Sequence, residues 1–400
     1  MNAFVGVATT KEKSTRWKEC IYREKPIYQR ENEIRSEFGR DYTRLLHSKA
    51  YRRLKHKTQV FFAANNDHVC TRMEHVHHVS SVSYSIAQYL GLNTELVLAI
   101  AIGHDIGHAP FGHDGEYLLR SIAQKYYDGS FCHEQNGLFF ADNIELLQNE
   151  QGQEETLNLT YAVRDGIVSH CGEMDDRSLF PREEYINLKT ITKPSIYDPF
   201  TWEACIVKVA DKISYLGRDL EDAIRLKIIQ QEEQNELKDI LSFYWGRKYS
   251  SASNTALIHS FATDLCLNSH PEKGILFSDR CFQTILGIKE FNYKYIYKHP
   301  RLNYYKQYAD LIINSIFDTL NELYHSSELI KNIENKKQIF PKLIKSFEKW
   351  LIIYSDYQKK EDVIYPIFSD RMNYQKCIVD FISSMSDSFA IEMFNELTTF

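Results

Sequence analysis

Hydrophobic residues along most of this chain recur every three or four positions, which is the spacing of one face of an α-helix. Between Glu74 and Leu90 the valines, isoleucine and leucine follow this spacing, and the same rhythm runs from Trp202 to Leu226. Residues 376–397 repeat it near the end of the chain. No strand-like alternation extends beyond a few residues and no internal repeat is present. The pattern therefore predicts an all-α chain, with at most a small hairpin.

The segment TELVLAIAIGHDIGH, residues 94–108, is apolar over about a dozen positions. We expect a buried helix here, with a buried strand as the alternative. Thr94, just after the turn expected at Gly91, is the predicted N-cap. Gly107 and Pro110 are predicted to end the helix.

The remaining length is harder to divide, because a chain of 400 residues suits either one large domain or two fused units. No linker rich in proline, glycine or serine separates two parts. We expect residues 331–337 to be an exposed loop or a solvated helix face. We expect the aromatic residues of 302–308 to be surface and core, with a subunit interface as the alternative.

Composition excludes several classes of protein. The net charge of -6 gives no overall basic field for nucleic acid, although Arg52, Arg53, Lys55 and Lys57 form a local basic patch. Eight scattered cysteines without a C-x-x-C pair argue against a disulfide scaffold and a zinc ribbon. No signal-like segment and no run of 18 apolar residues is present. We therefore expect a cytoplasmic protein that does not cross a membrane.

Four polar residues stand out inside the apolar pattern: His75, His104, Asp105 and Asp211. An adjacent His-Asp pair at the end of an apolar helix is costly to bury unless something binds it. Three helices would each bring ligands to the interior of a bundle, a common way to build a metal site. The predicted cofactor is a divalent ion (Mn, Mg, Fe, Zn, Ni or Co), because these donors do not select among such ions.

An isolated His-Asp pair occurs by chance in many proteins, so the segment that follows it carries the argument. That segment is HDIGHAPFGHDGE, residues 104–116. His108 is one helical turn from His104, which would place both on the same side. The proline and glycine that follow would turn the chain and bring His113 and Glu116 back over the metal. An imidazole and a carboxylate beside a metal suit general acid–base work.

This segment resembles the HD-domain dNTP triphosphohydrolases, the dGTPase-like enzymes. Their pattern H-D-x-G-H-x-P-F-G-H-x-G-E is matched here at every fixed position. Similar segments of that family are matched by RLLHSKAYRRLKHKTQV (44–60), RMEH (72–75), ADKISY (210–215) and DFISSMSD (380–387). The resemblance runs from about residue 33 to the end of the chain. The HD segment is highly specific and the other segments are moderately so.

The resemblance implies a fold and an activity. The expected fold is an HD-domain helical bundle with additional C-terminal helices: an N-terminal arm (1–32), an HD phosphohydrolase core (33–235) and a C-terminal helical region packed on the core (236–400). The implied reaction is metal-dependent hydrolysis of a deoxynucleoside triphosphate, dGTP or another dNTP, to a deoxynucleoside and inorganic triphosphate.

The resemblance also implies a role for each matching residue. The metal ligands would be His75, His104, Asp105 and Asp211. The catalytic residues would be His113 and Glu116, with His113 as the acid near the leaving oxygen. The phosphates would be met by Arg72, His108, His133 and Lys212, of which Arg provides a bidentate fork and Lys a point charge. The sugar and base would be met by Gln59 at the 3′-hydroxyl, Val60 at the 2′ position, Tyr215 and Asp219.

The chain departs from the family pattern beside Asp219. Family members often carry histidine just before this aspartate, whereas this chain has Arg218. Two interpretations are open: Arg218 adds positive charge to the pocket, or it forms an ion pair with Glu221 or Asp222. The departure leaves base preference undetermined.

Two other functions remain as alternatives. One is another HD-type nucleotide phosphohydrolase, a monophosphatase or phosphodiesterase, which would not need a triphosphate-length row of basic groups. The other is a nucleotide-sensing HD protein without catalysis, against which the intact metal and acid–base positions argue. The resembled family also suggests a homo-oligomer and, as further partners, an allosteric nucleotide or single-stranded nucleic acid.

Overall fold

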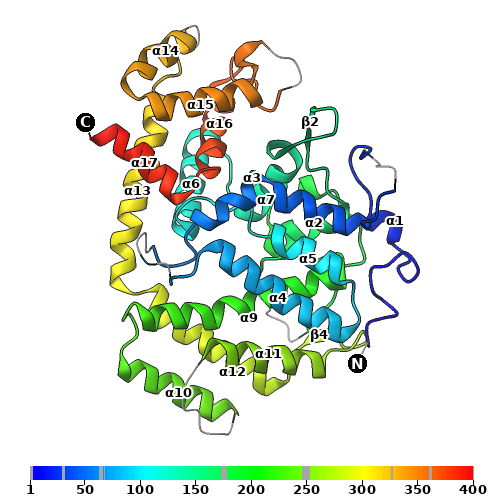
Figure 1. Ribbon diagram of the computed structural model, residues 1–400. Helices are drawn as coiled ribbons and strands as arrows, with labels where there is room; N and C mark the ends of the chain where they lie inside the picture. Colours follow the sequence, from blue (N-terminus) through cyan, green and yellow to red (C-terminus); the bar gives the residue numbers. More distant parts are fainter. Residues whose placement is uncertain are drawn as a thin grey trace.

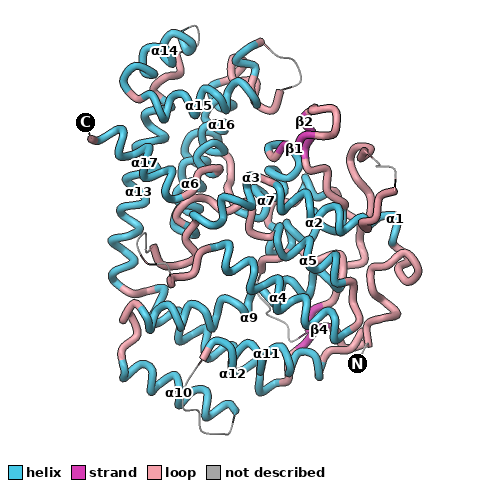
Figure 2. The backbone as a smooth tube through the Cα atoms, in the orientation of Figure 1, coloured by secondary structure: helices cyan, strands magenta, loops and turns pink. Residues whose placement is uncertain are grey.

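The structure is a computed structural model that describes residues 3–28, 32–62, 66, 68–172, 178–245, 253–325, 328–359 and 363–399. Within these ranges the chain folds into seventeen α-helices and two small antiparallel sheets (Figures 1 and 2). The predicted all-α fold with a small hairpin is confirmed. None of the described helices combines the length and apolarity that a bilayer crossing needs. All eight cysteines are free thiols.

The helices follow one another along the chain with mostly short connections. Their bounds are α1 (Trp17–Cys20), α2 (Glu37–His47), α3 (Lys49–Arg53), α4 (Arg72–Leu90), α5 (Thr94–Gly103), α6 (Gly112–Tyr127), α7 (His133–Phe139), α8 (Tyr161–Ser169), α9 (Trp202–Arg225), α10 (Gln231–Trp245), α11 (Asn254–Asn268), α12 (Asp279–Asn292), α13 (Pro300–Asn321), α14 (Leu329–Ile339), α15 (Pro341–Tyr354), α16 (Arg371–Ser383) and α17 (Asp387–Thr398). The sheets pair β1 (Leu146–Gln148) with β2 (Glu154–Thr156), and β3 (Ser178–Leu179) with β4 (Ile275–Leu276).

Local capping chemistry sets the ends of the helices around the His-Asp pair. Helix α4 begins with a capping box, in which Thr71 and Glu74 satisfy each other's backbone N–H groups. It ends at Gly91, whose φ of 82° is the left-handed conformation that glycine adopts readily. Helix α5 is capped by Asn93 and not by Thr94 as predicted, since the Asn93 side chain accepts from the backbone N–H of the two residues after Thr94.

Helix α5 also ends earlier than predicted. Its last residue is Gly103, and residues 104–107 form a turn in place of a further helical turn. The His104 imidazole contributes to this ending, because its Nδ1 lies 2.6 Å from the carbonyl oxygen of Ala101. The His-Asp pair therefore lies in a turn just beyond the helix, where its side chains can point away from the helix axis.

Tertiary structure changes one prediction about the C-terminal half and fits two others. The rhythm of residues 376–397 is split between α16 and α17, because Ser386 begins a new helix by accepting from the backbone N–H of Phe389. Residues 331–337 lie within α14. Among the aromatics of 302–308, Tyr305 stacks on Phe62 with ring centroids 5.3 Å apart, whereas Tyr304 is 74% exposed.

Two hydrophobic cores hold the helices together. The first is built from α2, α4, α5, α8, α9, α11 and α12, and the second from α6 and α13–α17 (Figure 1). The turn after α5 joins them, because Ile106 packs in the first core while Ala109 and Phe111 pack in the second. Helix α6, which follows this turn, packs against α13 and α16. The C-terminal helices are thus in direct contact with the segment that carries the His-Asp pair.

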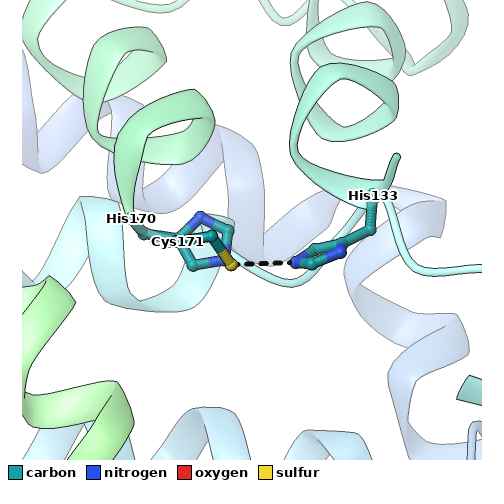
Figure 3. A group of neighbouring side chains, drawn as sticks. All are labelled: His133, His170 and Cys171. Carbon is teal, nitrogen blue, oxygen red and sulfur yellow. Dashed lines mark hydrogen bonds between the residues drawn. The ribbon is translucent and has the colours of Figure 1, made fainter. Parts of the chain in front are cut away.

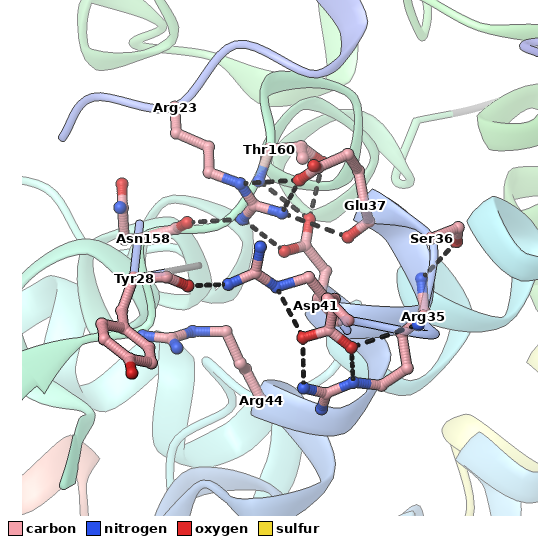
Figure 4. A network of polar contacts seen from close by, with 12 residues as sticks. Arg23, Tyr28, Arg35, Ser36, Glu37, Asp41, Arg44, Asn158 and Thr160 are labelled. Carbon is pink, nitrogen blue, oxygen red and sulfur yellow. Dashed lines mark hydrogen bonds and ion pairs between the residues drawn. The ribbon is translucent and has the colours of Figure 1, made fainter. Parts of the chain in front are cut away.

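The N-terminal segment is tied to the first core by Arg23 (Figure 4). The guanidinium donates to the carboxylates of Glu37 and Asp41 and to the backbone carbonyl of Asn158. Asp41 also accepts from the backbone N–H and the hydroxyl of Thr160, at 2.8 and 2.6 Å. The side chains of Arg23 and Asp41 are 6% and 0% exposed, so water does not screen this ion pair.

We expect Arg23→Ala to lower the free energy of unfolding by about 3 kcal/mol, since it leaves the buried Asp41 carboxylate without its cation. Urea unfolding followed by circular dichroism would measure this loss. Arg35→Ala is the matched control, because Arg35 pairs with Glu33 near the surface and its side chain is 32% exposed. This control should cost less than about 1 kcal/mol. Equal losses in the two variants would contradict the assignment.

A buried carboxyl in α16 should make stability depend on pH. Asp380 accepts from the Tyr365 hydroxyl at 2.7 Å, and burial raises its pKa to about 6. Between pH 4 and 6 the folded chain therefore holds a proton that the unfolded chain has released, so stability falls as pH rises through this window. The loss amounts to about 3 kcal/mol and is complete above pH 6.

Asp380→Asn should remove this pH dependence while keeping an oxygen that accepts from Tyr365. Relative to the unchanged protein, the variant should gain about 3 kcal/mol in unfolding free energy between pH 4 and pH 7. Denaturant unfolding at several pH values gives the difference. Asp239→Asn, at an exposed position, should run parallel to the unchanged protein. A parallel curve for Asp380→Asn as well would show that Asp380 is ionised throughout.

Candidate functional site

A cavity of about 500 Å³ opens where α4, the turn after α5, α7 and α9 meet. Every residue that the sequence predicts for the site lines it except His104 and Glu116, which lie just behind its wall. Four further residues complete the lining that bears on the chemistry: His170, Cys171, Ser195 and Tyr297. The cavity has the size of a pocket for a nucleotide-sized ligand.

Two histidines and two aspartates converge at the base of the cavity. His75, on the first turns of α4, has its Nε2 2.8 Å from Oδ1 of Asp211 on α9. Nε2 of His104 lies 3.5 Å from Oδ1 of Asp105 and 3.9 Å from Oδ1 of Asp211. Helices α4, α5 and α9 pack on one another, which brings these four side chains together from distant parts of the chain.

These four residues fit a divalent metal ion. The donor atoms of His75, His104 and Asp211 all lie within 4.8 Å of one another, close enough to share one ion. His104 is 0% exposed, and its Nε2 has no hydrogen-bond partner among the described residues. Its Nδ1 is held by a backbone carbonyl, the usual way in which a ligating imidazole is oriented. A buried nitrogen aimed at carboxylates without a bond is the mark of a ligand position.

The charges around the base keep both carboxyls ionised. Burial opposes ionisation of Asp105, but His104, His108 and Arg72 beside it hold its pKa well below the usual range. The pKa of Asp211 is lowered to about 2, because its bond to His75 outweighs the effect of burial. Carboxylates that are ionised near neutral pH are the form that ligates a cation.

A second group of imidazoles lies beside the turn. Nε2 of His108 lies 3.0 Å from Oδ1 of Asp105, so His108 and His104 approach the same carboxylate although no helical turn joins them. The rings of His108 and His133 stack with centroids 3.7 Å apart. Nδ1 of His133 lies 2.9 Å from Oε2 of Glu116.

The two predicted catalytic residues differ in exposure, because His113 lines the cavity and Glu116 does not. The His113 side chain is 76% exposed and faces the cavity, with Nδ1 3.9 Å from Oε2 of Glu116. Glu116 is buried behind His133 and accepts from Arg120 at 2.8 Å. Although burial would raise the pKa of Glu116, His133 and other neighbours lower it to about 2. Glu116 therefore orients His133 as an ionised acceptor and does not line the cavity itself.

The turn after α5 is held by very close packing. A Cβ atom on Gly107 would lie 2.1 Å from the backbone of both His133 and Gly137, so only glycine lets the turn lie against α7. Phe111 then adopts φ 64°, a left-handed conformation, before α6 begins at Gly112. The backbone N–H of Phe111 donates to Oδ1 of Asp387 at 2.9 Å.

Two buried ionisable side chains from distant segments support this turn. Lys57 is 2% exposed, so it does not belong to the surface basic patch that the sequence predicts. Its ammonium donates to the backbone carbonyls of His108 and of Ser383, the latter at 3.1 Å. Asp387, in the first turn of α17, accepts from the backbone N–H of Thr58 at 2.9 Å. Lys57 and Asp387, which lie far apart in the chain, thus both hold the backbone of the turn that follows α5.

The cavity is also lined by Gln59, Val60, Tyr215, Asp219 and Tyr297. The hydroxyl of Tyr297 donates to Oδ2 of Asp219 at 2.5 Å, and burial raises the pKa of Asp219 to about 7. This contact spans 78 residues, so no local pattern could have indicated Tyr297.

Arg218 directly precedes Asp219 in the chain but does not line the cavity. Its guanidinium atoms lie 3.5 Å from a carboxylate oxygen of Glu221 and 3.8 Å from one of Asp222. Of the two interpretations that the sequence leaves open, the geometry therefore favours the structural ion pair.

Two of the residues missed by sequence reasoning, His170 and Cys171, directly follow the buried helix α8. The sequence signal here is weaker than at His104 and Asp105, because α8 contains Arg164 and Asp165 and no family pattern follows it.

Comparisons with known proteins identify the relatives of this chain. The HD domain family matches residues 72–216, a range that contains His75, His104, Asp105 and Asp211. A protein of Rickettsia bellii named deoxyguanosinetriphosphate triphosphohydrolase-like protein is 33% identical over 386 residues, covering 94% of each chain. Proteins with the same name from Rickettsia prowazekii and Pelagibacter ubique are 32% and 29% identical, covering 94% and 98% of this chain and 94% and 99% of their own.

Identity of this extent runs through the C-terminal helices as well as the matched domain. Together with the HD domain match, it shows that this chain belongs to the deoxyguanosinetriphosphate triphosphohydrolase-like family of HD-domain proteins.

Proposed function

We propose that this protein hydrolyses deoxynucleoside triphosphates to a deoxynucleoside and inorganic triphosphate, using a divalent metal ion held by His75, His104, Asp105 and Asp211. One observation carries the proposal. A single cavity joins three of these ligands, His75, Asp105 and Asp211, to a row of cationic and imidazole side chains, Arg72, His108, His133 and Lys212. A row of this kind is needed for a chain of three phosphates and not for a monophosphate.

In the proposed reaction a water oxygen bonds to the α-phosphorus and the bond from that phosphorus to the 5′-oxygen breaks. When bound, the divalent ion supplies Lewis acidity at the α-phosphate. Arg72 neutralises charge on the phosphates through Nε and Nη2, which have no hydrogen-bond partner among the described residues, while Asp105 holds its Nη1 at 3.0 Å. Lys212 adds a second positive charge from the cavity wall.

The leaving 5′-oxygen needs a proton, and in this proposal His113 donates it from the cavity wall. Burial, Arg72 and His133 lower the pKa of His113 to about 4, and the carboxylate of Glu116, 3.9 Å from its Nδ1, acts in the opposite direction by favouring the protonated imidazole that this step uses. Glu116 also holds His133, which faces the phosphates in this proposal. Gln59 and Val60 would contact the sugar, with Val60 and Tyr215 leaving no room for a 2′-hydroxyl. Asp219 would meet the sugar or the base edge.

The test is a product analysis. The purified protein is mixed with Mn²⁺ or Mg²⁺ and each of the four dNTPs, and the products are separated by ion exchange. A His104→Ala, Asp105→Ala double variant runs alongside. Inorganic triphosphate and deoxynucleoside that appear only with the unchanged protein would support the proposal, and their relative yields would give the base preference.

Other products would replace the proposal with one of the alternatives. Orthophosphate or pyrophosphate would keep the metal site and move the scissile bond. Turnover of monophosphates or cyclic nucleotides alone would point to the other HD-type phosphohydrolases, and bound nucleotide without turnover would point to a sensor. Three further predictions can be tested on the same purified protein: a homo-oligomer, a bound allosteric nucleotide and bound single-stranded nucleic acid.

A further inference from the structure

Two imidazoles and a thiol meet in the cavity wall beside the proposed metal ligands. His133 begins α7, His170 follows α8 directly, and Cys171 comes next in the chain (Figure 3). The sulfur of Cys171 points toward the His133 ring, with Sγ 3.4 Å from Nε2 (Figure 3). All three residues line the cavity, so this group is reachable from its interior.

Each imidazole of the trio has one nitrogen engaged and the other available. Nδ1 of His133 lies 2.9 Å from the Glu116 carboxylate, so Nδ1–H donates and Nε2 is left to face Cys171. Nδ1 of His170 lies 2.8 Å from the carbonyl oxygen of Ile167, which can only accept. His170 is 1% exposed, and its Nε2 takes no part in this contact. A carboxylate or carbonyl behind an imidazole is the usual outer partner of a metal-ligating histidine.

The orientation of His170 repeats that of His104. Each histidine directly follows the last residue of a buried helix, and each has its Nδ1 bound to the carbonyl three residues earlier. Their ring centroids lie 5.0 Å apart. The same local geometry thus presents one Nε2 to the four-residue set and another to the trio.

The distances suit a tetrahedral ion. Zn²⁺ bonds to thiolate at about 2.3 Å and to imidazole at about 2.0 Å, which puts sulfur and nitrogen about 3.5 Å apart at a tetrahedral angle. The observed separation of Cys171 Sγ and His133 Nε2 is 3.4 Å, and the three donor atoms lie within 4.8 Å of one another. Two nitrogens and one sulfur favour a thiophilic ion over Mg²⁺ or Mn²⁺, which prefer oxygen ligands.

We propose that His133, His170 and Cys171 form a second cation site, which binds Zn²⁺ or a similar thiophilic ion independently of the four-residue set. The fourth ligand position would face the cavity. One consequence rests on the function proposed above: since His133 would face the phosphates of the substrate, an ion bound to the trio would block substrate binding. Zinc would then inhibit the enzyme.

Cobalt is the probe that separates the two sites, because only a thiolate ligand gives a sulfur-to-cobalt charge-transfer absorption band. The full-length apo-protein is titrated with Co²⁺ while absorption and bound metal are measured. The unchanged protein should bind two ions per chain and show the band. Asp211→Asn should lose one ion and keep the band, because its substitution affects only the other site.

Cys171→Ser should bind one ion and lose the band, and His170→Gln should do the same if the serine variant folds poorly. Cys132→Ser is the matched control: Cys132 neighbours His133 in the chain and is half-buried, but its sulfur contacts Gln135. This control should behave as the unchanged protein does. One bound ion without a band in the unchanged protein, or a band that survives in Cys171→Ser, would overturn the proposal.

Inhibition by zinc provides a second test of the proposal. Added Zn²⁺ should inhibit dNTP hydrolysis by the Mn²⁺-loaded protein, and Cys171→Ser should need at least ten times more zinc for the same inhibition. Equal inhibition of the two proteins would remove the link between the trio and the substrate. If no hydrolysis occurs at all, the proposed function fails, whereas the cobalt titration still decides whether the trio binds metal.

Discussion

Asp211→Asn should reduce hydrolysis by roughly 10³-fold, because a ligated metal ion supplies several kcal/mol of transition-state stabilisation and about 1.4 kcal/mol corresponds to a factor of ten. Asparagine keeps the shape of the side chain and removes the negative charge. The carboxylate lies 2.8 Å from Nε2 of His75, in the centre of the proposed ligand set. Initial rates with saturating dNTP, together with the metal content of the dialysed protein, measure the effect.

Thermal unfolding separates a lost metal from a damaged fold. A metal ion at one hundred times its dissociation constant should stabilise the unchanged protein by about 2.7 kcal/mol and leave Asp211→Asn unaffected. Glu221→Gln is the control on the same helix: its side chain is 40% exposed and lies outside the cavity. It should keep both the rate and the metal-induced shift. Asp211→Asn with full activity would exclude Asp211 from the metal site.

Asp387→Asn should destabilise the protein by about 3 kcal/mol and also slow hydrolysis at least tenfold. One carboxylate accepts from the backbone N–H groups of Thr58 and Phe111, and an asparagine would turn its NH₂ group toward one of them. Thr58 precedes Gln59 and Val60 in the cavity wall, and Phe111 precedes the helix that carries His113. Loss of these hydrogen bonds would therefore displace both the segment that carries Gln59 and Val60 and the helix that carries His113.

Denaturant unfolding and steady-state kinetics on the same preparations test this second effect. Asp370→Asn is the control, because Asp370 caps α16 from an exposed position and asparagine caps a helix as well as aspartate does. It should change neither stability nor rate. A double-mutant cycle with Lys57→Met should show coupling, since Lys57 precedes Thr58 in the chain and donates to the carbonyl groups of His108, in the same turn as Phe111, and of Ser383. A stable but slow Asp387→Asn would assign the residue to positioning alone.

Much of the fold was predictable because helices depend on local spacing. The rhythm of α4 and α9 and the apolar run of α5 identify three helices that surround the site. The ends of these helices were less predictable, because the N-cap at Asn93 and the early end at Gly103 depend on side-chain bonds and on packing against α7. The break between α16 and α17 likewise depends on the cap that Ser386 provides.

The candidate site divides in the same way. His75, His104, Asp105 and Asp211 were predictable as a group, because polar residues inside or directly after an apolar run need a partner that compensates for their burial. The hydrogen-bond partner of Asp219 was not predictable, because Tyr297 lies 78 residues further along the chain. The burial of Lys57 was hidden by its basic neighbours, which made it look like part of a surface patch. Glu116 lies near His113, as predicted. It is buried behind His133, however, and this position depends on tertiary packing.

The turn that joins the two hydrophobic cores has a consequence for how this protein can be divided. A fragment cut at residues 72 and 216 would keep every proposed metal ligand. It would nevertheless lose Val60 and Tyr297 from the cavity wall and the carboxylate that fixes Phe111, and it would expose the apolar face of α6. The smallest fragment worth expressing as an enzyme is therefore close to the whole chain, and insertions or fusions are better tolerated at its outer loops than at either edge of the matched domain.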